Sequence, residues 1–283
     1  MLKSCRHPVA RSPQDYAMQY EDIEFRSSDG LTLQGWRING NTNKLFIIAH
    51  PMFMNRHGFI AEKGGAFKLF KKNIFLLKLA GVLNKEGHSV IAFDFRNHGA
   101  SDSKLCGFGS TEYQDIFGIM DYIDDAQDLR KKDICCIGLG SGANAIITAF
   151  GEGRARLKRV KCIIAVQPTS AVTFLNHYIS TKFNALLAYL VYIIDRIMQM
   201  RAGVSIMNMS PEQYAQDVFI PTLYVQAEFD PWVDMFELDR IAENNSGQIK
   251  KWIIEDQALE EMDVYNYISE HPDRIFRFLE KYF

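Results

Sequence analysis

The run ICCIGLGSGANAII, from Ile134 to Ile147, joins a strand-like apolar stretch to a cluster of small residues around Ser141. Small residues let a strand turn directly into a helix, and such a turn can expose a nucleophilic hydroxyl at the edge of a sheet. A serine there attacks acyl carbon atoms when a histidine removes its proton and an acid orients the histidine. The run therefore raises the hypothesis of acyl-transfer chemistry.

The elements expected to carry this turn alternate between strands and helices. Several short runs of β-branched and aromatic residues have the continuous apolar pattern of strands that are buried on both faces of a parallel sheet. These runs are KLFIIAH (44–50), SVIAFDF (89–95), ICCIGL (134–139), VKCIIAV (160–166), TLYVQA (222–227) and KKWIIE (250–255). The segment EDIEFRSSDGLTLQGWRI before them predicts an antiparallel edge pair, because Asp-Gly supplies the positive φ of a tight hairpin.

Amphipathic segments between the strands, such as 73–87 and 113–126, repeat apolar residues at intervals of three and four and predict crossover helices. The predicted fold class is therefore α/β, a mostly parallel eight-stranded sheet with helices on both faces. The last segment, 271–283, is expected to form a helix that docks on the sheet. Its first turn holds Pro272, and its apolar stripe is Ile275, Phe278, Leu279 and Tyr282.

Length and composition favour one domain over residues 1–283, because a chain of 283 residues with 47% hydrophobic residues can bury a large core. Residues 1–20 lack the apolar core of a secretory signal and are expected to form a loose arm. The net charge of −2 disfavours nucleic acid and anionic lipid as partners of the whole surface. Five cysteines, with Cys135 and Cys136 on opposite faces of one predicted strand, favour a reduced, cytoplasmic chain.

Over nearly its whole length the chain resembles the α/β-hydrolase superfamily, by motifs in the order of that family. The stretch DFRNHGASDS, from Asp94 to Ser103, resembles the structural D-x-R-G-H-G-x-S turn that follows the fourth strand. IIAHPMF resembles the loop after the third strand, although Pro51 replaces a glycine and has no N–H to donate. In AEFDPWV, Asp230 stands at the position of the triad acid.

In this family the nucleophile sits in the tight turn between a strand and a helix, called the nucleophile elbow. The resemblance implies which residue of this chain stands at that position. The family has four strand residues followed by G-x-S-x-G, so Gly140 stands at the position of the nucleophile. Glycine accepts the strained positive φ of that position, which suggests that the chain lost a nucleophile and gained stability. In the alternative frame Ser141 is the nucleophile, and Leu139 and Ala143 then stand at the flanking small positions.

The resemblance also implies where the oxygen of a bound acyl group would lie. Its hydrogen-bond donors would be the backbone N–H groups of Met52, Phe53 and Ser141. The expected ligand site includes His177 as well, since that histidine falls in the segment expected to cover the pocket. No cofactor and no metal ion are expected.

The family's histidine follows the eighth strand, and there EDQALEEMDVY has Glu261 in its place. His271 is expected to be a cap or surface residue, and His50, His57, His88 and His98, which fall in other loops, are expected to be turn or surface residues. Glu261 beside Asp230 would make two carboxylates repel each other, so that one of them holds its proton more tightly. The alternative is that Glu261 points into solvent.

Residues 170–211 correspond to the helical lid that the family inserts between the sixth and seventh strands. Its apolar residues are expected either to cover a hydrophobic ligand, to contact a protein partner, or to pack as ordinary core, and the last interpretation is favoured. They are Leu186, Tyr189, Leu190 and Ile193, followed by Met198, Met200, Met207 and Met209. The longest apolar run, 183–194, has twelve residues and is too short to span a membrane, which needs about 20.

Two functional hypotheses follow. The first is a protein without serine-hydrolase activity that keeps a pocket for a small apolar ligand or a protein partner. The second is an active ester or thioester hydrolase, acyl transferase or lyase with a non-standard site, in which Ser141 or Glu261 acts with Asp230. The first is favoured, because the nucleophile and the histidine are replaced together.

Overall fold

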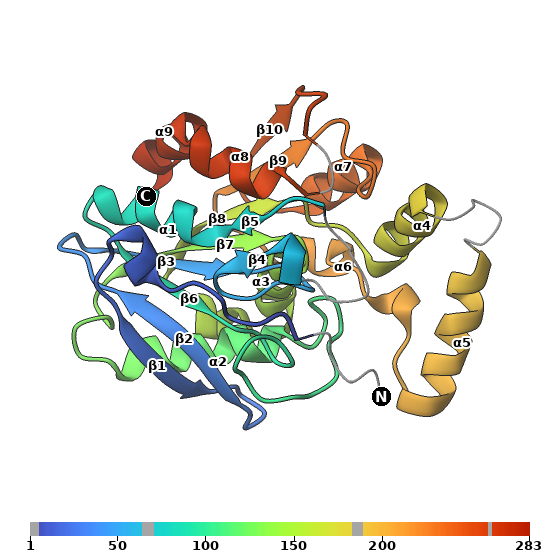
Figure 1. The fold of residues 1–283 in the computed structure, drawn as a ribbon, viewed down its shortest axis with the longest axis horizontal. Helices are drawn as coiled ribbons and strands as arrows, with labels where there is room; N and C mark the ends of the chain where they lie inside the picture. Colours follow the sequence, from blue (N-terminus) through green and yellow to red (C-terminus); the bar gives the residue numbers. More distant parts are fainter. Residues whose placement is uncertain (1–5, 64–70, 183–188, 260–261) are drawn as a thin grey trace.

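The computed structural model describes residues 6–63, 71–182, 189–259 and 262–283. Within them, an eight-stranded sheet has the strand order β1-β2-β6-β3-β7-β8-β9-β10 (Figure 1). The strands are β1 (Glu21–Arg26), β2 (Thr32–Ile38), β3 (Lys44–Ala49), β6 (Ser89–Phe93), β7 (Asp133–Leu139), β8 (Val160–Val166), β9 (Thr222–Ala227) and β10 (Ile249–Ile254). β2 is antiparallel to both of its neighbours, and the six strands from β6 to β10 are parallel. The predicted class and the antiparallel edge pair are confirmed.

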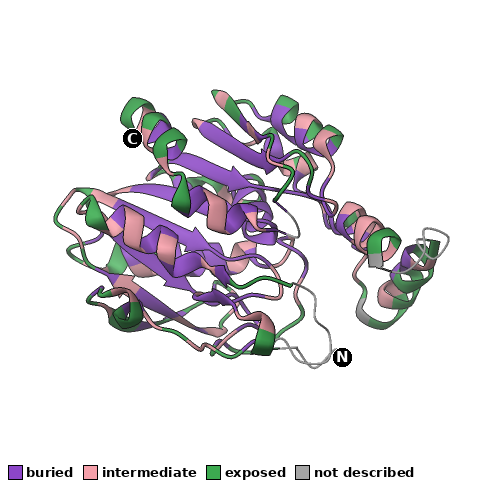
Figure 2. Ribbon diagram, turned by 45° about the horizontal axis from the view of Figure 1, so that its top comes forward, coloured by how far each residue is buried: buried purple, intermediate pink, exposed green. Residues whose placement is uncertain are grey.

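Helices cover both faces of this sheet, because the strands alternate apolar side chains between the two faces. Phe46 and Cys135 pack on the face covered by α1 (Leu76–Lys85), α8 (Val264–Glu270) and α9 (Asp273–Tyr282). Ile47 and Cys136 pack on the face covered by α2 (Tyr113–Asp125), α3 (Ser141–Gly153) and α7 (Met235–Asn244). The resulting cores are the purple layers of Figure 2. The predicted final helix is confirmed.

The N-terminal arm is not loose where the structure describes it, so that expectation is wrong from residue 6 onward. The 3₁₀ helix η1 (Pro13–Tyr16) packs against α1. His7 is only 5% exposed, its carbonyl accepts a hydrogen bond from Asn55 Nδ2 at 2.8 Å, and its ring Nε2 accepts one from Ile60 N–H at 2.9 Å. The arm therefore closes over the loop that follows β3.

A small hairpin of β4 (Gly58–Phe59) and β5 (Ile74–Phe75) extends that loop and was not predicted. The lysine-rich segment EKGGAFKLFKK, residues 62–72, lies between its strands in the sequence, mostly outside the described residues. A short 3₁₀ turn, η2 (Ala61–Lys63), follows β4.

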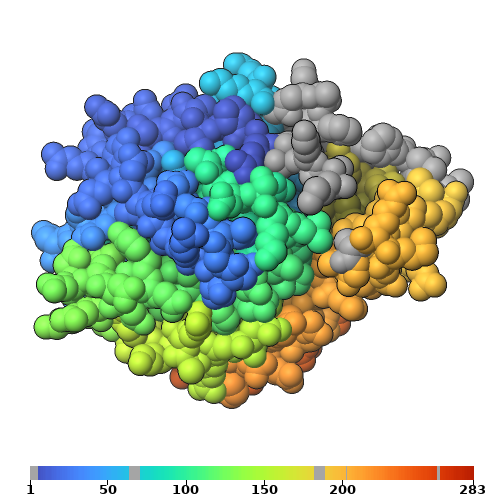
Figure 3. Space-filling view, turned by 90° about the horizontal axis from the view of Figure 1, so that it is seen from below, coloured from blue at the N-terminus to red at the C-terminus, as the bar shows by residue number. Residues whose placement is uncertain are grey.

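The insertion between β8 and β9 contains α4 (Ala171–Lys182), α5 (Leu190–Ala202), the 3₁₀ turn η5 (Ile206–Asn208) and α6 (Glu212–Ala215). In Figure 1, α4 and α5 lie at one end of the molecule, beyond the edge of the sheet, and Figure 3 shows the yellow and orange side chains of this insertion at the surface. The helical prediction is confirmed, but the favoured interpretation as ordinary core is wrong for α5, where Tyr189, Ile193 and Met200 are exposed. Leu186 lies outside the described residues. None of the described helices is long and apolar enough to cross a membrane.

Candidate functional site

The turn between β7 and α3 centres on Gly140. This glycine has φ +52° and ψ −120°, a conformation that other residues adopt only at a cost of about 1–3 kcal/mol. Ser141 begins the helix and has no positive φ. Gly142 also has to be glycine. A Cβ there would lie 2.2 Å from the carbonyl oxygen of Ala49, so only glycine lets α3 start this close to β3. The strained position of the turn is therefore residue 140, as the predicted frame requires, and not residue 141.

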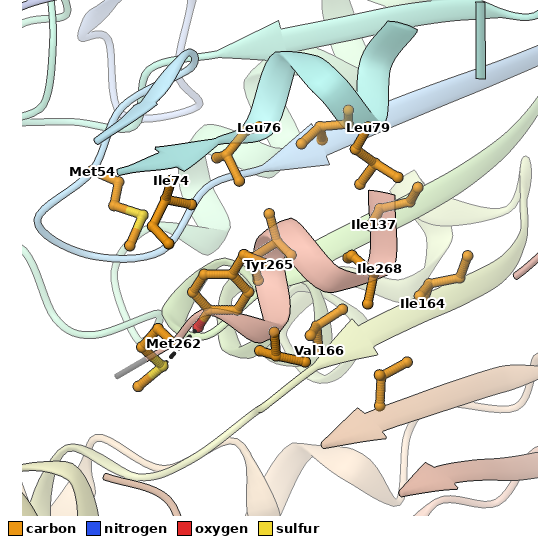
Figure 4. Packing of buried hydrophobic residues seen from close by; sticks show 14 of the residues in the cluster. Met54, Ile74, Leu76, Leu79, Ile137, Ile164, Val166, Met262, Tyr265 and Ile268 are labelled. Carbon is orange, nitrogen blue, oxygen red and sulfur yellow. Dashed lines mark hydrogen bonds between the residues drawn. The ribbon is translucent and has the colours of Figure 1, made fainter. Parts of the chain in front are cut away.

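The space beside Gly140 is occupied by another side chain. An ideal Cβ on Gly140 would lie 2.8 Å from the hydroxyl oxygen of Tyr265 and 3.1 Å from Cβ of Pro51. The Tyr265 hydroxyl donates a hydrogen bond to Sδ of Met262 at 3.2 Å, and its ring packs among buried apolar residues (Figure 4). Burial and the nearby charge of Asp230 raise the pKa of Tyr265 well above its usual range, so its hydroxyl stays protonated. A side chain added at residue 140 would meet this hydroxyl.

Ser141 is buried, and its hydroxyl lies over the expected oxyanion donors. The N–H of Met52 donates to Ser141 Oγ at 2.6 Å. The N–H of Phe53, whose φ is +69°, donates to Nε2 of His98 at 3.3 Å. The N–H of Ser141 itself is among the first four of α3, which have no partner inside the helix. Of the expected donors, the Met52 N–H is thus occupied by the chain's own hydroxyl and the Phe53 N–H by a histidine ring.

Asp230 lies in the loop after β9, and backbone and side-chain amides surround its carboxylate. Oδ1 accepts a hydrogen bond from Trp232 N–H at 3.0 Å. Oδ2 accepts from Met262 N–H at 2.8 Å and from Gln167 Nε2 at 3.2 Å. These bonds connect the ends of β8 and β9 to the loop after β10. Glu261 lies outside the described residues, so its expected interaction with Asp230 stays a prediction.

The cavity at the elbow is small and mostly apolar. Its volume is about 20 Å³, which is room for about one water molecule. Its lining is drawn from the loop after β3, the elbow, α4 and the loop after β10. The lining residues are Pro51, Met52, Phe53, Met54, Phe108, Gly140, Ser141, Thr169, Phe174, Met262 and Tyr265. Gly140, Ser141, Met52 and Phe53 thus meet at one site, as predicted.

Several solved structures with the same architecture are of hydrolases. An esterase of Pyrococcus furiosus matches with a TM-score of 0.75 and 22% identity over 98% of this chain and 96% of the esterase. An α/β hydrolase from Penicillium sp. matches with a TM-score of 0.65 and 15% identity over 94% of this chain and 99% of that chain. Est1E from Butyrivibrio proteoclasticus, solved with ferulic acid bound, matches with a TM-score of 0.59 and 16% identity over 90% of this chain and 98% of that chain. The chain has the α/β-hydrolase fold.

No family model matches the chain. The thiohydrolase aneE of Aspergillus aculeatus is 34% identical over 158 residues, which are 55% of this chain and 43% of that protein. The chain therefore matches less than half the length of this curated relative.

Histidines near the elbow of this α/β-hydrolase fold are already hydrogen-bonded to the backbone. His50 lies between the carbonyl of Pro51, 2.8 Å from Nδ1, and the N–H of Phe95, which donates to Nε2 at 3.0 Å. His98 lies between the carbonyl of Arg96, 2.9 Å from Nδ1, and the N–H of Phe53. Burial lowers the pKa of both rings, so they are neutral and have no free nitrogen to act as a base. His57 and His98 lie in turns and His50 in the loop after β3, as the turn interpretation expects, but all three are buried, so the surface interpretation is wrong for them.

His177 belongs to α4 and does not line the cavity. Its Nδ1 lies 3.1 Å from the carbonyl oxygen of Pro231, directly after Asp230. This contact ties the insertion to the loop that carries Asp230. The described residues include no group of His, Cys, Asp or Glu side chains placed to hold a metal ion.

Sequence reasoning missed Tyr265 and Gln167 as parts of the site. Tyr265 ends the stretch EDQALEEMDVY, in which the family's histidine is missing, so the family resemblance already indicated that it lies near the site. Gln167 has φ +49° at the end of β8, and nothing in its sequence neighbourhood indicates that its amide would contact Asp230.

Proposed function

We propose that this protein is a non-hydrolytic member of the α/β-hydrolase fold, which acts by binding and not by cleaving an acyl bond. The observation that carries the proposal is the closed space at Gly140, where the Tyr265 hydroxyl lies 2.8 Å from the position of a side chain's first atom. Two further features support it. The Ser141 hydroxyl occupies the Met52 N–H, and the described histidines next to the elbow have no free ring nitrogen.

The expected loss of activity is large. In a well-studied serine protease, removing the nucleophile or the base lowers kcat by about a millionfold and leaves about 10³–10⁴ over the uncatalysed rate. That remainder depends on oxyanion donors. Since Ser141 Oγ accepts the bond from Met52 N–H, even this remainder is expected to be reduced here.

A small apolar ligand is the occupant that the cavity walls favour, because methionine and phenylalanine side chains dominate them. A volume of about 20 Å³ admits no such ligand unless a wall moves. Phe174 on α4 is the wall that belongs to the insertion, so the ligand would enter by displacing α4. Binding would raise the unfolding temperature in a thermal-shift screen with fatty acids and small esters.

Hydrolysis through Ser141 is the second candidate, and the thiohydrolase relative is the observation that favours it. In this hypothesis the Ser141 hydroxyl would have to leave the Met52 N–H and find a base. The expected carboxylate for that role is Glu261.

Labelling with a fluorophosphonate probe tests the proposal. The wild-type chain, Ser141→Ala and Tyr265→Phe are each treated with the probe, and modified peptides are identified by mass spectrometry. We expect no labelling of any of them above heat-denatured controls. Labelling of the wild type that disappears in Ser141→Ala would reject the proposal in favour of the second candidate. Tyr265→Phe is the matched control, because it opens space at Gly140 without supplying a nucleophile.

A further inference from the structure

Helix α5 exposes a face of large apolar side chains. Tyr189, at its N-cap, is 58% exposed, and one and two turns later Ile193 and Ile197 are 48% and 41% exposed. Met200 completes the same face and is 81% exposed. Spacings of four, four and three residues place these side chains on one side of a helix. Contiguous apolar surface of this kind on a soluble protein indicates a binding surface.

The opposite side of α5 attaches the helix to the protein. Val191 is fully buried there, and Asp195 one turn later is 4% exposed. The Asp195 carboxylate accepts hydrogen bonds from Ile206 N–H at 2.6 Å, Gln199 Nε2 at 2.7 Å and the Ser205 hydroxyl at 2.9 Å. Asp195 is the only acidic residue of α5, so the attachment leaves no carboxylate on the exposed side of the helix. In Figure 2 the exposed, green side of α5 faces away from the body of the molecule.

Charge on the free side of α5 is positive. Arg196 and Arg201 are exposed, and neither forms a salt bridge with another described residue. Across residues 170–211 the sequence holds Lys182, Arg196 and Arg201 against the single acid Asp195, although the whole chain has a net charge of −2. The apolar face is therefore bordered by cations in a chain that is otherwise acidic.

We propose that α5 binds an anionic lipid surface, with its apolar face in the interface and its two arginines among the headgroups. Amphipathic helices with apolar residues on one face and arginine or lysine beside them bind in this way. The helix has 13 residues and is about 20 Å long, against about 30 Å for a bilayer core, so it lies along the surface and does not cross it. The proposal concerns the outer side of the insertion and does not depend on the chemistry of the elbow.

The charges favour a lipid surface over a second copy of the chain. A twofold interface brings the same patch of both copies together. Two α5 faces would then approach each other with Arg196 and Arg201 on both sides and no described acid of the helix free to pair with them. Anionic headgroups supply the missing negative charge, worth a factor of about five in affinity for each arginine near the surface.

Co-sedimentation of the full chain with vesicles tests the proposal. One vesicle preparation is pure phosphatidylcholine and the other contains about 30 mol% phosphatidylserine. We expect binding to the anionic vesicles that weakens as salt is raised. The double variant Arg196→Gln/Arg201→Gln should bind about 25-fold more weakly, and Ile193→Ser/Ile197→Ser should lose measurable binding.

The matched control is Arg130→Gln/Lys131→Gln, which removes two exposed cations just before β7, at the other end of the parallel strands from the elbow. It should bind like the wild type, and unfolding temperatures within about 2 °C of the wild type would show that each variant is folded. The proposal is overturned if the wild type binds neither preparation, if it binds both equally, or if the α5 variants bind as the wild type does. Dimerisation that depends on Ile193 and Ile197, without vesicle binding, would assign the face to a second copy.

Discussion

The elbow and helix α5 differ in where their side chains find partners. At the elbow, Asp230, Ser141 and Tyr265 each bond to neighbours inside the protein, and the remaining cavity holds about one water molecule. On α5, the acid is bonded internally while large apolar side chains and two arginines face outward. Both proposals rest on this difference: the polar groups of the elbow are bonded internally, whereas the apolar face of the insertion is exposed.

Asp230→Ala should have the largest effect on stability. It leaves the buried donors of Trp232, Met262 and Gln167 without their acceptor, and we expect a loss of about 3 kcal/mol in the free energy of unfolding. Urea denaturation measures it. Asp230→Asn is the control, because it keeps one acceptor oxygen and should cost less. If Asp230→Ala left the free energy of unfolding unchanged, the internal hydrogen bonds at the elbow would not be stabilising the fold.

Gly140→Ser should lower stability by about 2 kcal/mol, because a side chain there is strained at φ +52° and meets the Tyr265 hydroxyl. The variant should still fail to hydrolyse p-nitrophenyl esters for want of a base. Combining it with Tyr265→Phe removes the clash, so the double variant should be about 1 kcal/mol more stable than the sum of the single losses predicts. A higher unfolding temperature for Gly140→Ser alone would contradict the idea that glycine relaxed this turn.

Acid should lower the stability of the fold through His7, which lies in the arm that closes over the loop after β3. Burial, with the neighbouring charges of His57 and Lys63, lowers the pKa of His7 from 6.5 to about 4. The unfolded chain therefore binds a proton at His7 that the folded chain does not, and stability falls as pH decreases from about 6.5 to about 4. His7 stacks on Phe59 and holds the loop that lines the cavity, so we expect a loss of about 1–2 kcal/mol between about pH 7 and pH 5.

His7→Gln is the control for this pH dependence. Glutamine offers an acceptor to Ile60 N–H but does not titrate, so the variant should be less stable at neutral pH and less sensitive to acid. An unchanged slope of stability against pH would assign the effect to His50, His57 or His98, whose pKa values are lowered in the same direction.

Sequence reasoning reached the parts of this molecule that depend on the local chain. The turn at Gly140 was predictable because a strand that becomes a helix at once needs glycine there, and β3 and β7 were predictable from continuous apolar runs. It did not reach the contact of Ser141 with Met52, or of Tyr265 with Gly140, since these join segments about 90 and 125 residues apart. These two contacts depend on how distant segments pack against each other, which the local sequence pattern does not indicate.

The same limit explains two wrong expectations. His7 was placed in a loose arm because its burial depends on Asn55 and Phe59, which lie about 50 residues later. The apolar residues of α5 were interpreted as core because periodicity predicts an apolar face without saying what covers it. In α5 the covered side is the narrow one that holds Val191 and Asp195.

The smallest effect on stability should come from the exposed face of α5. Ile197→Ser removes a side chain that is 41% exposed, and we expect the free energy of unfolding to change by less than about 0.5 kcal/mol. Val191→Ser, on the buried side of the same helix, should cost about 2 kcal/mol, because it removes a fully buried side chain and buries a hydroxyl. Both are measured by urea denaturation. Equal losses would mean that Ile197 is covered by the protein itself in solution, and α5 would then offer no free surface to a membrane.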